Sequence, residues 1–410
     1  MSIQTELLAA PKVPLRYLVR FNPRPSATKS DESCYLPMEA ISEFGAVDSS
    51  RRRPTSELAQ GYSFLADGDV AYAKVTPCFE NGKGLRATAL PEGHAFATTE
   101  ITVMRPSSSL DSRYLAWTLQ SEDFRGPGEA HMSGAGGLKR VPESYAARFR
   151  VRHPSIDVQR AVADYLDRET AQIDAFIAKN EELITLLTER RTAQIDALLS
   201  SVASEQHEVK INWLFTFHNG DRGASYPSRD EYVSEGVPFI NAGHLKNGAV
   251  DYNAMNYIPD VKFAEMGGAK LRAGDILFCL RGSLGKLGVF DEDGSGALAS
   301  SLVALRRRNP AMSVTFFAYL LQSSRVRDAI DLAQTGSAQP NLSVEQLAQF
   351  RLSVPGVAAQ HEIARKIELI TESVDEAIEI ARCGVSLAQE RRAELITATV
   401  TGKIDVEVAA

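Results

Sequence analysis

The stretch FRVRHPSIDVQ at residues 149–159 recurs as FRLSVPGVAAQ at residues 350–360, which lie 201 positions later. The same spacing holds without a gap as far as the tripeptide ERR at 189–191, which recurs at 390–392. A single insertion in either copy would have shifted every later pair, so shared composition does not explain the match. The chain is predicted to be a tandem duplication with a repeat of about 201 residues.

The repeat continues upstream in a looser form. LAWTLQS at 115–121 faces FAYLLQS at 317–323, and Gly68-Asp69 faces Gly274-Asp275. The offset drifts only in this upstream part, which is therefore the variable part of each half. Each half is predicted to be a globular module followed by a long helix, with a first module at 1–155, a central helical segment at 156–205, a second module at 206–355 and a distal helical segment at 356–410.

Both helical segments carry apolar residues at helical spacing. Those in the second advance by three or four residues at a time, which is the seam of a coiled coil: Ile363, Ile367, Ile370, Val374, Ile378, Ala381, Val385 and Ala388. Those in the first form a broader stripe: Val162, Leu166, Ile173, Phe176, Ile177, Leu183, Ile184 and Leu187.

A helix of about 40 residues, on the order of 60 Å long, needs a partner, and the second copy in the same chain is the obvious one. Pseudo-twofold packing favours an antiparallel intramolecular pair. The heptads alone leave a parallel pair and an intermolecular dimer open.

The modules have the pattern of a mixed α/β (α+β) fold. Residues 70–73 and 276–279 are short apolar runs after a Gly-Asp turn, and residues 101–104 and 302–305 supply a second strand. The segments at 115–121 and 317–323 are predicted to be helical. Trp117 and Tyr319 stand at equivalent positions in them and are predicted core residues rather than platforms for stacking bases.

Composition limits the class of protein. The hydrophobic content is 44%, yet no apolar run approaches the ~18 residues of a membrane span, and the N-terminus lacks the pattern of a signal peptide, so a cytoplasmic location is expected. Cys34, Cys78, Cys279 and Cys383 lie far apart with no Cys-x-x-Cys pair. Neither a disulfide framework, a metal site nor a cofactor is expected.

The net charge of −7 at first argues against nucleic acid, but the charge is unevenly distributed. The two modules together carry +2, whereas the helical segments carry −9. Basic clusters such as the arginine triplets at 51–53 and 306–308 could therefore act locally on DNA. The competing interpretation of each triplet is a solvated loop or strand end.

With these residues identified, the chain resembles the specificity subunit of type I restriction-modification systems over nearly its whole length. The resemblance rests on GDV at 68–70 followed by KVTPCFENGK at 74–83, on GDIL at 274–277 followed by RG at 281–282 and GK at 285–286, and on GSAQPNL at 336–342. It is completed by Gln159 and Gln360 near the helix starts. The first module departs from the pattern, because GAGGLK stands at 134–139.

The resemblance implies a protein without chemistry of its own. Two target-recognition domains would read a bipartite, asymmetric stretch of double-stranded DNA, and the length of the helices would set the spacer between the half-sites. The helices would hold two methyltransferase subunits and, in the larger assembly, two restriction subunits.

The loops after the Gly-Asp strands are the candidate DNA contacts, because base reading and phosphate anchoring need exposed polar and basic side chains. The candidates are Lys74, Asn81, Lys83, Lys139 and Arg140 in the first module, and Arg281, Ser283, Lys286, Gln339 and Asn341 in the second. The alternative is that these loops are tight turns with lysines facing solvent. The Gly-Asp pairs themselves are predicted to be structural turns.

No catalytic constellation is found in the sequence. The Asn/Asp-Pro-Pro-aromatic tetrapeptide of amino methyltransferases is missing, and Gly285-Lys286 is followed by Leu287 rather than by the Ser or Thr of a phosphate loop. The leading hypothesis is therefore a non-enzymatic DNA reader. The alternative is a duplicated coiled-coil adaptor that binds protein and not DNA.

Overall fold

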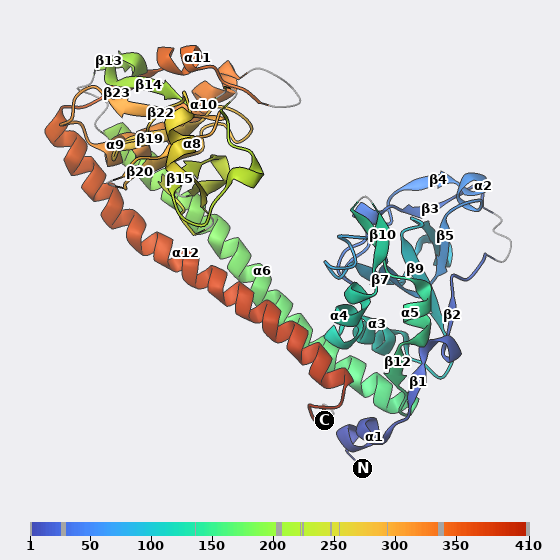
Figure 1. Cartoon of the computed structure of the whole chain (residues 1–410). Helices are drawn as coiled ribbons and strands as arrows, with labels where there is room; N and C mark the ends of the chain where they lie inside the picture. Colours follow the sequence, from blue (N-terminus) through green and yellow to red (C-terminus); the bar gives the residue numbers. More distant parts are fainter. Residues whose placement is uncertain are drawn as a thin grey trace. The chain divides into compact units, whose positions relative to one another are not determined.

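The computed structural model describes residues 2–25, 30–135, 137–201, 207–221, 223, 225–246, 248–253, 255–292, 294–334 and 340–406. It contains two compact units (Figure 1). The first unit is Met1–Glu182 together with Ala381–Ala410, and the second is Leu183–Ile380. The two long helices, α6 (Ile156–Ser201) and α12 (Val357–Val400), each begin in one unit and end in the other.

The first unit is an α/β module in which two four-stranded sheets pack beside short helices. Its strand orders are β2-β9-β6-β7 and β4-β3-β8-β5, with the small pairs β1-β12 and β10-β11. The strands are β1 (Lys12–Pro14), β2 (Val19–Phe21), β3 (Glu32–Leu36), β4 (Arg52–Pro54), β5 (Ser63–Ala66), β6 (Val70–Ala73), β7 (Gly84–Arg86), β8 (His94–Ala97), β9 (Ile101–Pro106), β10 (Ser133–Ala135), β11 (Leu138–Arg140) and β12 (Arg150–Arg152). The short helices are α1 (Ile3–Ala9), α2 (Thr55–Leu58), α3 (Ser112–Gln120), α4 (Glu122–Ala130) and α5 (Glu143–Arg148).

The second unit repeats this plan with a longer main sheet. Its strand orders are β14-β22-β19-β20-β17-β16 and β18-β15-β21, with the pair β13-β23. The strands are β13 (His207–Lys210), β14 (Phe215–Asn219), β15 (Val237–Ile240), β16 (Leu245–Lys246), β17 (Gly248–Val250), β18 (Asn256–Ile258), β19 (Asp275–Cys279), β20 (Leu287–Phe290), β21 (Ala297–Leu298), β22 (Leu302–Arg307) and β23 (Arg351–Val354). The short helices are α7 (Ile211–Leu214), α8 (Asp260–Glu265), α9 (Val314–Leu321), α10 (Ser324–Ala333) and α11 (Val344–Gln349).

The central strands β6 and β19 are buried on both faces, which explains why β6 and residues 276–279 of β19 are apolar without interruption. Side chains alternate across a strand. Val70 and Tyr72 therefore join the core that contains α3, while Ala71 joins a separate core with the second sheet. In β19, Ile276 and Phe278 likewise join the helical core, and Leu277 joins the other. The strands and helices predicted from the sequence in both modules are confirmed.

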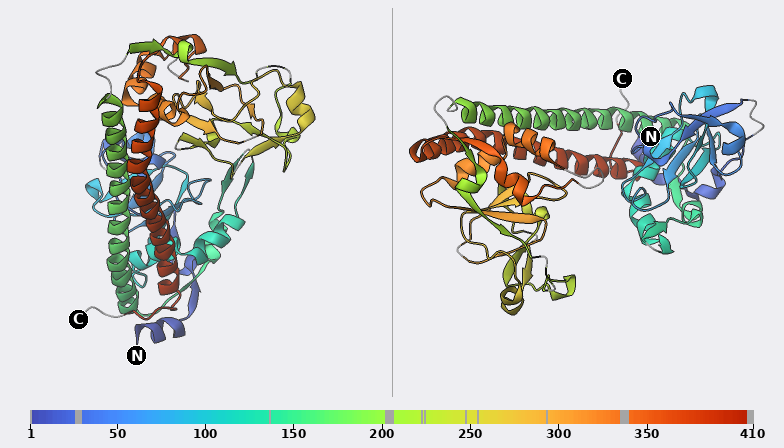
Figure 2. Two further views of the ribbon diagram at one scale, coloured as in Figure 1. Left: turned by 90° about the vertical axis from the view of Figure 1, so that its left-hand side faces the viewer. Right: turned by 90° about the horizontal axis from the view of Figure 1, so that it is seen from above.

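The two long helices lie side by side and run antiparallel, as Figure 2 shows. In the first unit Arg392 near the end of α12 forms an ion pair of 2.8 Å with Asp174 of α6. In the second unit Arg191 near the end of α6 forms the corresponding ion pair of 2.6 Å with Asp375 of α12. Both members of the second pair lie 201 residues from those of the first, so the contact obeys the pseudo-twofold repeat. The predicted antiparallel pair is confirmed.

Each unit buries the end of a helix that begins in the other unit. Ile396 and Val400 of α12 lie in the core of the first unit beside Val162 and Leu166 of α6. Ile195 of α6 lies in the core of the second unit beside Ile363 and Ile367 of α12. The bounds of the four segments expected from the sequence remain predictions. Each compact unit includes the end of a helix that begins in the other unit, so the units do not coincide with those segments.

The α12 seam is confirmed by burial: Ile363, Ile367, Val374, Ile378 and Ala381 are all buried. The α6 stripe is only partly buried. Phe176 is 49% exposed and Leu183 is 44% exposed, so the stripe predicted from the sequence extends beyond the buried surface. Periodicity could not separate them from their buried neighbours, because a broad apolar stripe is wider than the surface that one partner helix covers. None of the described helices combines the length and apolarity that a bilayer crossing requires.

Candidate DNA interface

The candidate residues of the first module are brought together by contacts between the β6–β7 loop and the β10–β11 hairpin. The Thr76 backbone N–H donates to the Lys139 carbonyl at 2.9 Å, and the Thr76 hydroxyl accepts the Lys139 N–H at 3.0 Å. Val75 forms an antiparallel bridge with Arg140, and the Val141 N–H donates to the Lys74 carbonyl. Lys74, Lys139 and Arg140 therefore lie on one joined surface.

Two of these three side chains make no direct polar contact through their charged group. Within the described residues, the ammonium groups of Lys74 and Lys139 have no hydrogen bond or ion pair. Arg140 instead donates twice to Glu100, at 2.8 Å each. The Arg140 guanidinium lowers the pKa of Glu100 from its ordinary value, so this carboxylate keeps its charge and offsets that of Arg140.

Lys83 and Lys286 occupy equivalent positions and have equivalent partners. The Lys83 ammonium donates to the Met38 carbonyl at 3.2 Å, and the Lys286 ammonium donates to the Ala242 carbonyl at 2.8 Å. Each carbonyl belongs to a short 3-10 turn of its own module. Both lysines are half-buried and hold a loop against the module. From the sequence, they were expected either to contact DNA or to face solvent.

The second module reproduces the joined loops with different side chains. Arg281 forms an antiparallel bridge with Asn341, and its guanidinium Nε donates to the Asn341 side-chain oxygen at 3.2 Å. The Gly282 N–H donates to the Pro340 carbonyl, and Ser283 is exposed in the same turn. Gln339 lies outside the described residues. Asn81, from the corresponding loop of the first module, is exposed.

The arginine triplets are occupied by contacts within the modules. Arg51, Arg52 and Arg53 pair with Glu39, Glu92 and Glu57. In the second triplet, Arg306 pairs with Asp275, while the guanidinium groups of Arg307 and Arg308 donate to backbone carbonyls. Glu57 is only four residues from Arg53, but Glu39, Glu92 and Asp275 are 12 to 40 residues from their arginines, and the remaining acceptors belong to the backbone. A count of charges by segment does not reveal these partners.

The Gly-Asp turns are structural, as predicted. Asp69 is 1% exposed, and its carboxylate accepts the Ala66 N–H at 2.8 Å and two bonds of 2.7 Å from Arg105. The Asp275 carboxylate likewise accepts the Arg272 N–H and two hydrogen bonds from the Arg306 guanidinium. These ion pairs fix the strand that leads into each candidate loop.

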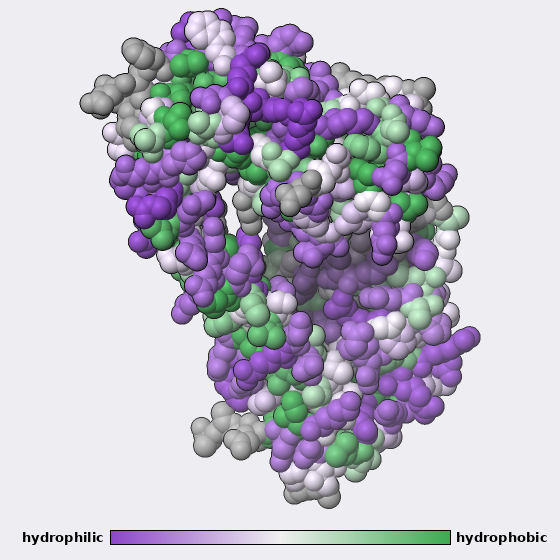
Figure 3. Space-filling view, turned by 60° about the vertical axis from the view of Figure 1, so that its left-hand side comes forward, coloured by the Kyte–Doolittle hydropathy of each residue, from purple (hydrophilic) through white to green (hydrophobic). Residues whose placement is uncertain are grey.

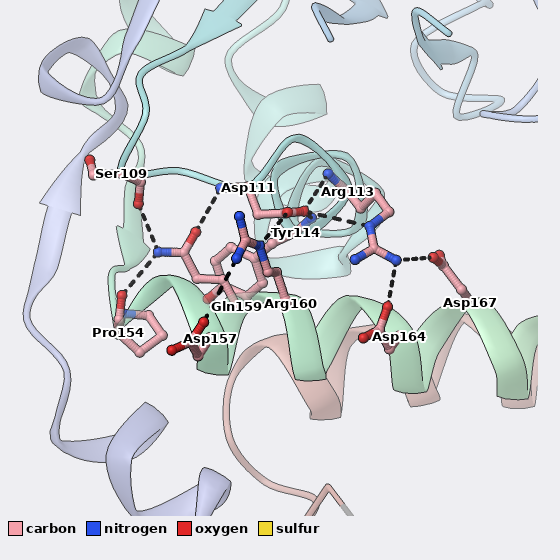
Figure 4. Close-up of polar contacts among 10 residues, drawn as sticks. All are labelled: Ser109, Asp111, Arg113, Tyr114, Pro154, Asp157, Gln159, Arg160, Asp164 and Asp167. Carbon is pink, nitrogen blue, oxygen red and sulfur yellow. Dashed lines mark hydrogen bonds and ion pairs between the residues drawn. The ribbon is translucent and has the colours of Figure 1, made fainter. Parts of the chain in front are cut away.

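Each module is attached to the start of its own long helix by a glutamine, shown for Gln159 in Figure 4. The Gln159 amide donates to the Pro154 carbonyl at 2.9 Å and to the Ser109 carbonyl at 3.0 Å, and its oxygen accepts the Asp111 N–H at 2.9 Å. Gln360 makes the corresponding bonds with Pro355 and Ser313. The glutamines that marked the repeat in the sequence therefore position the modules on the helices.

The helix surface carries a second repeated feature that the sequence analysis did not single out. Leu186 of α6 is 54% exposed and Leu387 of α12 is 59% exposed, and the two are 201 residues apart. On the face drawn in Figure 3, hydrophobic residues lie between larger hydrophilic areas. The 201-residue spacing could have identified these two leucines in the sequence. Because an apolar side chain is exposed at both equivalent positions, one common role should explain both.

Trp117 is partly buried against the first core, as predicted, but it is also a polar contact. Its indole N–H donates to Asp167 of α6 at 2.8 Å, and the Arg392 guanidinium lies 5.8 Å from its ring centroid. Within the described ranges, no group of three His, Cys, Asp or Glu side chains is arranged to hold a metal ion.

Comparison with known proteins gives a consistent result. Residues 204–380 match the type I restriction modification DNA specificity domain. The EcoEI specificity subunit of Escherichia coli is 31% identical over 196 residues, covering 44% of this chain and 33% of that protein. The EcoAI specificity subunit of the same species is 29% identical over 204 residues, covering 48% of this chain and 34% of that protein. The chain thus aligns with about a third of the length of each of these relatives.

The fold is shared over the whole length. A chain in a solved structure on complex assembly and conformational transition of the type I R-M system covers 96% of this chain and 98% of its own length, with a TM-score of 0.64 at 14% identity. The resemblance predicted from the sequence is confirmed by these matches.

Proposed function

Because this chain shares its DNA specificity domain and its fold with type I restriction-modification specificity subunits, we propose that it is a non-catalytic reader of a bipartite, asymmetric DNA target, with one half-site for each module. The joined loops carry this proposal. They occur once in each unit with the same backbone pairing and with different side chains, Lys74 and Lys139 in one and Arg281 and Asn341 in the other. Two loops with the same backbone pairing and different side chains would suit two half-sites of different DNA sequence.

The candidate residues divide into three roles. The ammonium groups of Lys74 and Lys139 suit backbone phosphates, since they are cationic and form no hydrogen bond or ion pair with the described residues. Arg281 suits a base edge, because a guanidinium can donate two parallel bonds to guanine. Asn81, Ser283, Arg140, Asn341 and Gln339 are secondary candidates, and Lys83 and Lys286 support the loops.

The proposal is tested by co-purifying the chain with a methyltransferase encoded beside it and sequencing the methylated bases in DNA that the complex has modified. A single gapped, asymmetric motif is expected. Arg281→Ala should relax one position of one half-site at a cost of about 1–3 kcal/mol in binding, whereas Lys139→Ala should lower affinity for all sequences and reduce the log-log salt slope by about 1. Lys179→Ala, an exposed change on α6, is the matched control. Stable complexes that retain no DNA would favour the protein-binding adaptor instead.

The same proposal includes two copies of a methyltransferase subunit, and in a larger assembly two restriction subunits, held by the helices. Support comes from Leu186 and Leu387, which are exposed at equivalent positions of the repeat. Two equivalent apolar positions suit two copies of one partner, because each copy could make the same contact. The ion pairs Arg191–Asp375 and Arg392–Asp174 repeat with the same spacing.

Replacing one of these leucines should remove one copy of the partner. Leu387→Asp is expected to convert a complex with two methyltransferase copies to one with a single copy, measured by native mass spectrometry, and Leu186→Asp should do the same. The double variant should bind none. Lys179→Asp, which changes an exposed polar position of α6, is the control. A substitution of Ile378 would not serve, because that side chain is buried. Unchanged stoichiometry in the double variant would contradict this docking position.

A further inference from the structure

A polar cavity of about 670 Å³ lies in the second unit, outside the candidate loops. It is formed by the end of β14 and the residues that follow it, by the segment 267–272, and by Arg306 of β22. Its charged lining consists of Lys270, Arg272 and Arg306 against one carboxylate, that of Asp221, with His218 beside them.

The Asp221 carboxylate is occupied by backbone groups. Asp221 is 5% exposed, and its two oxygens accept the N–H of Gly223 at 2.6 Å and the N–H of Gly267 at 3.1 Å. It forms no ion pair with a described cation, although it lies near enough to Lys270 to favour that residue's charged form. Its role is to hold together the two segments that line the cavity.

The cations differ in how far they are neutralised. Arg306 is paired with Asp275 at 2.7 Å. The Lys270 ammonium donates to the Phe263 carbonyl and lies 3.8 Å from the centroid of the Phe263 ring, so both of its direct contacts are with neutral groups. The exposed Arg272 guanidinium has no hydrogen bond or ion pair within the described parts of the chain.

Burial and neighbouring charges both act on two lining groups of the cavity. Burial lowers the pKa of Lys270. Burial also lowers the pKa of His218, and the charges of Arg306 and Arg272 lower it further, while Asp275 acts in the opposite direction. An anion in the cavity would relieve both effects, because it would stabilise the charged forms.

Among the described residues of the first unit, two positions that correspond to the cavity lining carry other side chains. The strand pairings make Asn22 the counterpart of His218 and Phe64 the counterpart of Lys270. The Asn22 amide is occupied by Glu143 at 2.6 Å, and Phe64 packs against the ring of Phe96. The histidine and the lysine of the cavity are therefore features of the second module and not of the repeat.

We propose that this cavity binds a phosphate group, held by Arg272 and Lys270. A guanidinium with free donors and an ammonium are the side chains that bind phosphate oxygens in proteins. Resting on the proposed function, the ligand is a backbone phosphate of the bound DNA. The cavity adjoins the start of β19, whereas the candidate loop follows the end of that strand, so the cavity would be an anchor separate from the loop.

Two measurements on the full chain test the proposal, with Arg272→Gln as the variant and Arg327→Gln as its control. Arg327 is also exposed and lies on α10 of the same unit, so both changes remove one positive charge. The first measurement is the thermal unfolding midpoint as inorganic phosphate replaces chloride at constant ionic strength. The second is the dependence of DNA affinity on salt.

Phosphate is expected to raise the unfolding midpoint of the Arg327→Gln control but not that of Arg272→Gln. Arg272→Gln is also expected to reduce the log-log slope of DNA affinity against salt by about 0.9, the value for one phosphate. A lost phosphate response with an unchanged slope would support the cavity and assign it to free phosphate, overturning the DNA assignment. Behaviour equal to that of Arg327→Gln in both measurements would overturn the proposal. If the unmodified chain binds no DNA, the proposed function fails, and the phosphate measurement still decides the cavity.

Discussion

Ile396→Ala, a change close to the C-terminus, is expected to destabilise the N-terminal module by about 2–5 kcal/mol, the usual cost of truncating a buried isoleucine to alanine. Ile396 is 1% exposed and lies in the core that contains Val70, Leu115 and Val162. Regional hydrogen exchange should show faster exchange in β6 and β9, with little change in β19 and β22. The effect follows from the exchange of helix ends between the units.

Ile195→Ala is the matched variant, because Ile195 is the repeat equivalent of Ile396 and lies in the second core. It should produce the opposite pattern, with faster exchange in β19 and β22 and little change in β6 and β9. If Ile396→Ala instead loosened the second unit, the antiparallel arrangement of α6 and α12 would be contradicted. Equal loosening of both units by each variant would show that the units unfold together.

Asp69→Ala is expected to cost about 3 kcal/mol of stability in the first unit, in the range for removing one partner of a buried ion pair. The Asp69 carboxylate is 1% exposed, and its loss leaves the Ala66 N–H and the Arg105 guanidinium without their acceptor. Arg105 is 36% exposed, so water can solvate part of its charge, which places the expected cost at the lower end. Thermal or urea unfolding measures the change.

Asp375→Ala breaks an ion pair of similar length and serves as the control. Asp375 is 50% exposed and Arg191 is 22% exposed, so the expected cost is about 1 kcal/mol or less. Asp275→Ala should repeat the large effect in the second unit, because Asp275 is also buried and holds Arg306. A loss from Asp69→Ala no greater than that from Asp375→Ala would refute a structural role for the Gly-Asp turn.

Two features of the candidate loops could not be predicted from the sequence. Lys74 and Lys139 are 65 residues apart in the sequence, and only the backbone contacts between the two loops show that they share a surface. Lys83 and Lys286 look like exposed loop lysines in the sequence, whereas their ammonium groups bind the Met38 and Ala242 carbonyls. A sequence pattern identifies which residue is charged, but the partner of that charge is set by folding.

The sequence by itself determined the duplication, the long helices and the α/β modules, because these depend on spacing and periodicity that are local to each segment. The gap-free repeat also predicted which residues would be equivalent, and the structure shows that two such sets form the ion pairs Arg191–Asp375 and Arg392–Asp174. Only the tertiary structure decided which helix end completes which core, which arginines are neutralised and where the cationic cavity at Arg272 lies. These depend on contacts between residues tens to hundreds of positions apart, and such contacts leave no periodic trace in the chain.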